Sequence, residues 1–126
     1  MPTSTELREA IARYADATGS RDPDKYAALF TPDAVQIDPY PDGVHKGRNE
    51  IHAFIKQSFE ACESMSWELE QFHAVADKAA VTFHITVTLA GDTTMHIRGV
   101  EIFTVNDDGL IAGVDAYWGE EDVTIG

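Results

Sequence analysis

The sequence predicts an α+β fold, with three helices in its first half and a β-sheet in its second. Apolar residues recur at intervals of three and four up to Phe59, which is the period of an amphipathic helix. From Trp67 onward they alternate with polar residues, as in a half-buried strand. Gly91-Asp92 and Asn106-Asp107-Asp108-Gly109 are turn sequences, so the strands they separate can pair antiparallel without crossover helices.

The length and the charge of the chain bound its class. Its 126 residues fit a single domain spanning residues 1–126, and 44% hydrophobic with 25% charged residues excludes a disordered or fibrous protein. A net charge of −13 disfavours nucleic acid and anionic membrane surfaces as partners. No apolar run approaches the ~20 residues of a membrane span, and no signal peptide is recognised, so we expect a cytoplasmic protein.

Neither a disulfide nor a metal site is expected from the cysteine and histidine pattern. The single Cys62 cannot form an internal disulfide. No histidine pair has a trustworthy metal-ligand spacing, which favours surface or packing roles for His45, His52, His73, His84 and His96.

The first helix is predicted between a capping signal and a glycine. Thr3 and Glu6 fit a capping box, and Gly19 indicates the end of the helix. The face that this helix buries has helical spacing and comprises Leu7, Ile11, Tyr14, Ala15 and Thr18.

Two further helices flank a short strand. Asp22 followed by Pro23 predicts the start of a helix that carries Tyr26, Leu29 and Phe30 and ends before Pro32. Another helix begins after Gly47 and frays beyond Ala61, with one face formed by Ile51, Phe54, Ile55, Ser58 and Phe59. Between them, Val35-Gln36-Ile37-Asp38 predicts a strand that is stopped by Pro39 and the turn Pro41-Asp42-Gly43.

The strands that follow are defined by their alternation. Trp67–Glu70, Val81–Leu89, Met95–Val105 and Leu110–Trp118 form the predicted sheet. A two-residue loop at Gly91-Asp92 would set apolar residues opposite threonines. A three-residue loop, 91–93, instead matches apolar with apolar by placing Leu89, Val87, Ile85 and Phe83 opposite Met95, Ile97, Gly99 and Glu101.

Glu101 is the one carboxyl group on this apolar face. Such a group escapes at a sheet edge, pairs with a cation, or stays in a pocket with a raised pKa. The pattern alone leaves these three alternatives open.

The sequence resembles the ketosteroid isomerase branch of the nuclear transport factor 2-like superfamily along nearly its whole length. The residues that carry the resemblance are Arg13-Tyr14-Ala15, Ala28-Leu29-Phe30 with Asp33-Ala34, Asp38-Pro39, Gly47, Ile51, Val75-Ala76, Ala79-Ala80, Phe103, Gly109 and Gly119-Glu120. The resemblance implies a conical α+β fold in which the three helices pack on a curved, largely antiparallel but mixed sheet and enclose a deep apolar pocket.

The resemblance also implies three catalytic residues. Asp38, in the Asp-Pro pair, matches the general base, and Tyr14 matches the tyrosine that holds the oxyanion. Glu101, two residues before Phe103, occupies the place of a protonated aspartate. Neutral donors fixed in a dry pocket stabilise negative charge on a carbonyl oxygen without reorganising during the reaction, and desolvation would keep Glu101 protonated.

Seven residues are expected to form the substrate-binding wall: Phe54, Ile55, Phe83, Ile85, Phe103, Val114 and Trp118. Two positions depart from the steroid isomerases. Glu101 is one methylene longer than their aspartate, and Ile55 replaces a tyrosine that hydrogen-bonds the catalytic tyrosine. Without that partner, Tyr14 is expected to be a weaker acid and a less tightly oriented donor.

The expected function is cofactor-independent isomerisation that moves a carbon-carbon double bond into conjugation with a ketone, on a 3-oxo-Δ5-steroid type of substrate. One alternative is a small polyketide cyclase, dehydratase or hydrolase in which Asp38 takes a proton from substrate or water. Another is a protein that binds an apolar ligand without turnover, because fold alone does not give function. Val100 and Ile102, on the outer face of the sheet, favour a homodimer.

Overall fold

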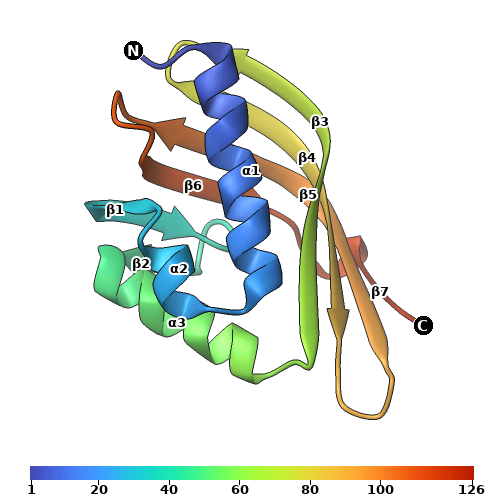
Figure 1. The fold of residues 1–126 in the computed structure, drawn as a ribbon. Coiled ribbons are helices and arrows are strands. Elements are labelled where there is room, and N and C mark those ends of the chain that lie inside the picture. The colour runs from blue at the N-terminus through green and yellow to red at the C-terminus, as the bar shows by residue number, and fades with distance from the viewer.

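Three helices lie on one face of a curved, open sheet in the computed structural model, which describes residues Met1–Gly126 (Figure 1). The helices are α1 (Ser4–Ser20), α2 (Pro23–Ala27) and α3 (Arg48–Glu60). The strands are β1 (Phe30–Ile37), β2 (Val44–Lys46), β3 (Ser64–Val75), β4 (Lys78–Thr88), β5 (Thr94–Val105), β6 (Ile111–Tyr117) and β7 (Val123–Ile125), with a short 3-10 helix, η1, at Glu120–Asp122. The predicted α+β class is confirmed.

The capping box predicted for α1 is present. The Thr3 hydroxyl accepts from the Glu6 backbone N–H at 3.1 Å, and the Glu6 carboxylate accepts from the Thr3 N–H at 2.9 Å. The helix passes Gly19 and ends at Ser20, and its C-cap residue Arg21 has a left-handed φ of 55°. The Arg21 guanidinium bonds the carbonyls of Phe59 and Glu63, so tertiary contacts fix the end that the glycine was expected to set.

The second helix is shorter than predicted. Asp22 caps it by accepting from the N–H groups of Asp24 and Lys25, but it ends at Ala27. Phe30 already pairs with Ile111, so the chain is extended two residues before Pro32. That proline lies where the register of β1 shifts, a place at which its missing N–H costs no ladder bond.

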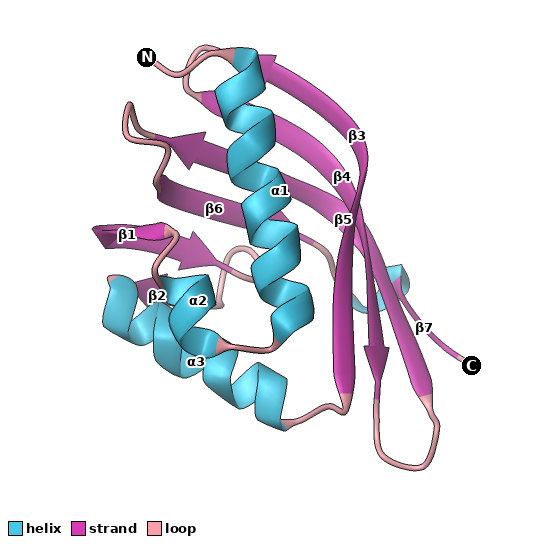
Figure 2. Cartoon of the chain, viewed as in Figure 1, coloured by secondary structure: helices cyan, strands magenta, loops and turns pink.

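The strands form one mixed sheet in the order β2-β1-β6-β5-β4-β3, and β7 pairs with β5 (Figure 2). Strands β1 and β6 are parallel, whereas all the other pairs are antiparallel. The three-residue strands β2 and β7 were not predicted, because so short a segment shows no alternation.

The predicted register of the β4–β5 hairpin is wrong by two residues. Val81, and not Phe83, lies opposite Glu101, because the loop is centred on Gly91 rather than on Asp92. The loop therefore comprises residues 90–92 instead of the predicted 91–93. Two of its residues, Gly91 and Asp92, have positive φ, at 80° and 64°. A shift of two keeps every side chain on its face, so Glu101 points into the interior as expected.

The core lies between the helices and the concave face of the sheet. Tyr26, Phe30, Phe83 and Phe103 are its largest fully buried side chains. Only four buried residues are polar or charged, namely Thr18, Thr31, Gln36 and Glu101. Gln36 and Glu101 belong to a single hydrogen-bond network, which borders the cavity described next.

Candidate active site

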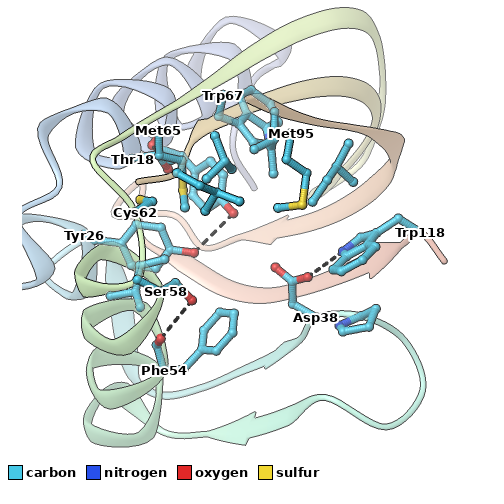
Figure 3. A pocket seen from close by; sticks show the side chains of 18 residues that line it. Thr18, Tyr26, Asp38, Phe54, Ser58, Cys62, Met65, Trp67, Met95 and Trp118 are labelled. Carbon is cyan, nitrogen blue, oxygen red and sulfur yellow. Dashed lines mark hydrogen bonds between the residues drawn. The ribbon is translucent and has the colours of Figure 1, made fainter. Parts of the chain in front are cut away.

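A cavity of about 400 Å³ opens beside the core, between the helices and strands β3, β4 and β5 (Figure 3). Of the 18 residues that line it, 14 are hydrophobic, and Asp38 is the only one with a carboxyl group. Figure 3 shows the Asp38 side chain directed into the cavity, with Trp118 beside it. A site of this kind accepts an apolar ligand and presents one candidate base to it.

The end of β1 positions Asp38. Its backbone N–H donates to the Gly43 carbonyl at 2.8 Å, and the Gly43 N–H donates to the Pro39 carbonyl at 2.9 Å. A Cβ atom on Gly43 would lie 2.2 Å from the Asp38 carbonyl oxygen, so only glycine fits this turn. The Tyr40 N–H donates to Ala116 on β6, which fixes the turn to the sheet.

Burial raises the pKa of Asp38 above its ordinary value. The indole N–H of Trp118, which donates to Asp38 Oδ1 at 2.8 Å, and the nearby His45 act in the opposite direction. His45 is held by stacking on Phe54, at 4.1 Å between ring centroids. Asp38 is therefore a carboxylate with increased proton affinity that still has one donor to stabilise its charge.

Glu101 lies inside the protein and is only 1% exposed. Its Oε1 accepts from the indole N–H of Trp67 at 2.6 Å, and its Oε2 is 3.3 Å from the Tyr14 hydroxyl. Burial is the main cause that raises its pKa to about 8, and the charge of Asp38 adds to it, while the two hydrogen bonds lower it. Of the three alternatives left open by the sequence, the last is therefore the nearest, because Glu101 is a buried carboxyl group with a raised pKa, although it lies behind the cavity wall.

Tyr14 has a hydrogen-bond partner, which corrects the expectation drawn from Ile55. The Tyr26 hydroxyl donates to the Tyr14 oxygen at 3.2 Å, and Gln36 Nε2 donates to the Tyr26 oxygen at 2.9 Å. Burial raises the pKa values of both tyrosines, which remain neutral donors. The supporting hydroxyl comes from α2, whereas the position of Ile55 on α3 provides only apolar wall.

The structure brings six of the ten predicted site residues to the cavity wall: Tyr14, Asp38, Phe54, Ile55, Ile85 and Trp118. Phe83, Phe103 and Val114 are instead buried in the core and do not line it. The Phe103 ring meets the Tyr14 ring edge-on, with 5.0 Å between ring centroids, and the Phe83 ring stacks on Trp67 at 6.0 Å. Val114, on β6, lies opposite Phe103 of β5 in the sheet. These three side chains support the wall from behind. Glu101 likewise contacts Tyr14 and Trp67 but does not line the cavity.

Sequence reasoning missed Trp67, Tyr26 and Gln36. Their helix and strand patterns indicate packing positions and no role at the site. Alternation in the strand around Gln36 favours the solvent-facing side for this residue, whereas the structure buries it fully and bonds it to Tyr26, so no signal in the sequence indicates its role.

No three or more histidine, cysteine, aspartate or glutamate side chains are grouped to hold a metal ion. The helices are also too short or too polar for any of them to cross a membrane.

The chain is similar to known proteins of one family. A family model described as the SnoaL-like domain matches residues 11–114. A steroid Delta-isomerase of Nocardioides simplex is 35% identical over 122 residues, which cover 97% of each chain. Among solved structures, a Delta 5-3-ketosteroid isomerase from Mycobacterium sp. superposes with a TM-score of 0.85 at 22% identity, over 96% of this chain and 98% of the other.

An epoxide hydrolase/cyclase-like enzyme, SalBIII, described in pyran ring formation in the polyether salinomycin, superposes with a TM-score of 0.90 at 24% identity over the whole of both chains. The two solved structures, at 24% and 22% identity, establish only that the fold is shared. The family follows from the family model and from the Nocardioides simplex relative at 35% identity. This protein therefore belongs to the SnoaL-like, or nuclear transport factor 2-like, family, in its ketosteroid isomerase branch.

Proposed function

We propose that this protein is a cofactor-independent isomerase that moves a carbon-carbon double bond into conjugation with a ketone, on a steroid-like 3-oxo-Δ5 substrate. The observation that carries the proposal is the pairing, in one apolar cavity, of a single carboxylate, Asp38, with a neutral hydroxyl donor, Tyr14. The similarity to a steroid Delta-isomerase over 97% of the chain supports the same reaction.

In the proposed first step, Asp38 removes a proton from the carbon between the carbonyl group and the double bond. The C–H electrons form a new double bond, the carbonyl π electrons move to oxygen, and a dienolate results. Asp38, now protonated, returns the proton to the far carbon of the original double bond, and the carbonyl group reforms. The raised proton affinity of Asp38 favours the first transfer, because a general base becomes more effective as its pKa rises toward the working pH while it stays ionised.

Tyr14 is the proposed donor to the developing oxyanion. Its hydroxyl is neutral and fixed by Tyr26, so it needs little reorganisation as charge forms on the substrate oxygen. Glu101 does not line the cavity, so we propose that the neutral acid acts through Tyr14, by donating from Oε2 to the Tyr14 oxygen. A tyrosine that accepts a hydrogen bond in this way becomes a stronger donor.

The experiment that tests the proposal is incubation of the protein with an unconjugated 3-oxo-Δ5-steroid. We expect the ultraviolet band of a conjugated ketone to appear while the mass of the product stays that of the substrate. Addition of water would show as a mass increase and would favour a hydrolase. A new ring would favour a cyclase, and saturable binding without a new absorption band would favour a carrier of apolar ligands.

The outer face of the sheet supports a proposal of self-association. Val100 and Tyr117 lie on adjacent paired positions and are 37% and 42% exposed, and the Tyr117 ring packs against Tyr40. We propose that two copies pair through this face and bury these side chains. Sedimentation equilibrium would show a dimer, and Val100→Asp would shift it toward the monomer.

A further inference from the structure

Trp67 both lines the cavity and donates a hydrogen bond to Glu101 behind it. It lies on β3, is 4% exposed, and directs its indole Nε1 at Glu101 Oε1 across 2.6 Å. The ring is held by Phe83, which stacks on it, and by Tyr14 and Phe103, which meet it edge-on. The indole is therefore fixed in orientation before any ligand binds.

The direction of this hydrogen bond is unambiguous, because an indole N–H only donates. Glu101 Oε1 must therefore be the acceptor, and the proton of the neutral acid belongs on Oε2. Oε2 is the oxygen that faces the Tyr14 hydroxyl, at 3.3 Å. The acid can then donate to the Tyr14 oxygen, and the ionised form would instead accept from it.

Tyr26 is a second fixed donor to the Tyr14 oxygen. The Gln36 amide donates to Tyr26, and Tyr26 donates to Tyr14. When Glu101 is neutral and carries its proton on Oε2, the Tyr14 oxygen can accept from two donors, Tyr26 and Glu101. Its own proton is left for a group in the cavity, which Tyr14 lines.

We propose that Trp67 is a positioning residue for Glu101: by holding Oε1 as an acceptor, it keeps the proton of the acid on Oε2, beside Tyr14. The catalytic consequence rests on the proposed isomerase function, whereas the effect on Glu101 does not. Without the indole donor, either oxygen of the acid can carry the proton, and the O–H no longer points only at Tyr14.

The same contact also makes Glu101 a stronger acid than its burial alone would allow, because the N–H stabilises the carboxylate. The other titratable groups that face Glu101 are Tyr14 from α1, Tyr26 from α2 and Asp38 at the end of β1. The negative charge of Asp38 disfavours the ionised form of Glu101. No lysine, arginine or histidine forms an ion pair with Glu101. Removal of the indole N–H should therefore raise the pKa of Glu101 further.

The two tryptophans of the chain provide a direct measurement in the free protein. Trp67 bonds Glu101 and Trp118 bonds Asp38, so each indole N–H proton reports one carboxyl group. We expect the Trp67 indole resonance in a proton-nitrogen NMR titration to move with a midpoint near pH 8, as Glu101 ionises. The Trp118 resonance should follow the titration of Asp38, and Trp118→Phe assigns the two signals.

Trp67→Phe removes the donor and keeps an aromatic ring. We expect the titration midpoint of the Glu101 carboxyl carbon, identified by its loss in Glu101→Gln, to move to higher pH. The matched variant Trp118→Phe should displace the Asp38 midpoint and have the smaller effect on Glu101. A Glu101 midpoint that is unchanged in Trp67→Phe, or a Trp67 indole resonance in the unsubstituted protein that ignores the ionisation of Glu101, would overturn the proposal.

The kinetic test separates positioning from a change in the cavity wall, since Trp67 also lines the cavity. We expect Trp67→Phe to lower kcat on the order of tenfold, less than the loss of a direct oxyanion donor, with little change in KM. In a Glu101→Leu background the same change should have no further effect on kcat, because the acid it positions is absent. An equal loss in both backgrounds would contradict the positioning role. If the unsubstituted protein does not isomerise the steroid, the proposed function fails, and the NMR titration still decides the role of Trp67.

Discussion

The hydroxyl of Tyr26 donates to the hydroxyl oxygen of Tyr14 at 3.2 Å, between two side chains that are both almost fully buried. This contact moves the support of the proposed oxyanion donor from α3, where Ile55 lies, to α2. Gln36 on β1 holds Tyr26 in turn. The proposed donor role of Tyr14 therefore does not require a tyrosine at position 55.

Tyr26→Phe should lower kcat on the order of tenfold, because Tyr14 loses the donor that orients it. The change also leaves the buried Gln36 amide without its partner, so we expect a loss of about 1–2 kcal/mol in the free energy of unfolding. Steady-state kinetics and urea denaturation measure the two effects. Thr5→Ala, which removes an exposed hydroxyl on α1, is the control and should show neither.

Tyr14→Phe should lower kcat by roughly 10²-fold, the order expected when one oxyanion donor is lost. The variant keeps the ring that packs on Tyr26, Trp67 and Phe103, but it removes the acceptor of the buried Tyr26 hydroxyl, so we expect a loss of about 1–2 kcal/mol in the free energy of unfolding. Turnover equal to that of the unsubstituted protein would remove Tyr14 from the proposed mechanism, whatever the role of Ile55.

Asp38→Asn should lower turnover by at least 10²-fold, on the order of a lost general base. An amide is nearly the same size as a carboxylate, and its oxygen can still accept from Trp118, so the fold and the binding of a phenol or steroid should persist. Equilibrium binding of a fluorescent phenol checks the second point. Near-normal turnover with intact binding would exclude Asp38 as the base.

Much of the fold was predictable because local signals act within a few residues. The capping box at Thr3 and the Asp22-Pro23 start of α2 both form as predicted. The inward direction of Glu101 was also correct, since the face of a strand depends only on the parity of the register. The parallel pairing of β1 with β6 joins segments about 80 residues apart and has no local signature.

The sequence predicts which side chains face the interior better than it predicts which of them line the cavity. Phe83 and Ile85 share one face of β4, yet only Ile85 lines the cavity. The difference arises because Phe83 packs on the Trp67 ring, which separates it from the cavity, and such a contact depends on the position of a neighbouring strand. The bonds from Trp67 to Glu101 and from Tyr26 to Tyr14 likewise join residues on different elements, so no spacing in the sequence indicates them.

Substitutions at Glu101 distinguish a neutral donor from a second base. Glu101→Gln keeps an oxygen for the Trp67 N–H and an N–H₂ group for the Tyr14 oxygen, so it should retain much of the activity. Glu101→Leu removes both and should lower kcat on the order of tenfold, because Tyr14 loses a donor that strengthens it. An inactive Glu101→Gln variant, with Glu101 shown by infrared spectroscopy to be ionised at neutral pH, would favour the hydrolase or cyclase alternative.

The pH dependence of stability gives an independent test of the protonation state of Glu101. Its carboxyl group has a pKa of about 8 in the folded protein, against an ordinary value of 4.5, so the folded state binds the extra proton between these values. Stability from this group is therefore complete below pH 4.5 and declines as the pH rises toward 8. Glu101→Gln does not titrate, and urea denaturation from pH 5 to pH 9 should show a shallower decline for this variant than for the parent. Parallel curves for the two proteins would mean that Glu101 is already ionised at pH 5.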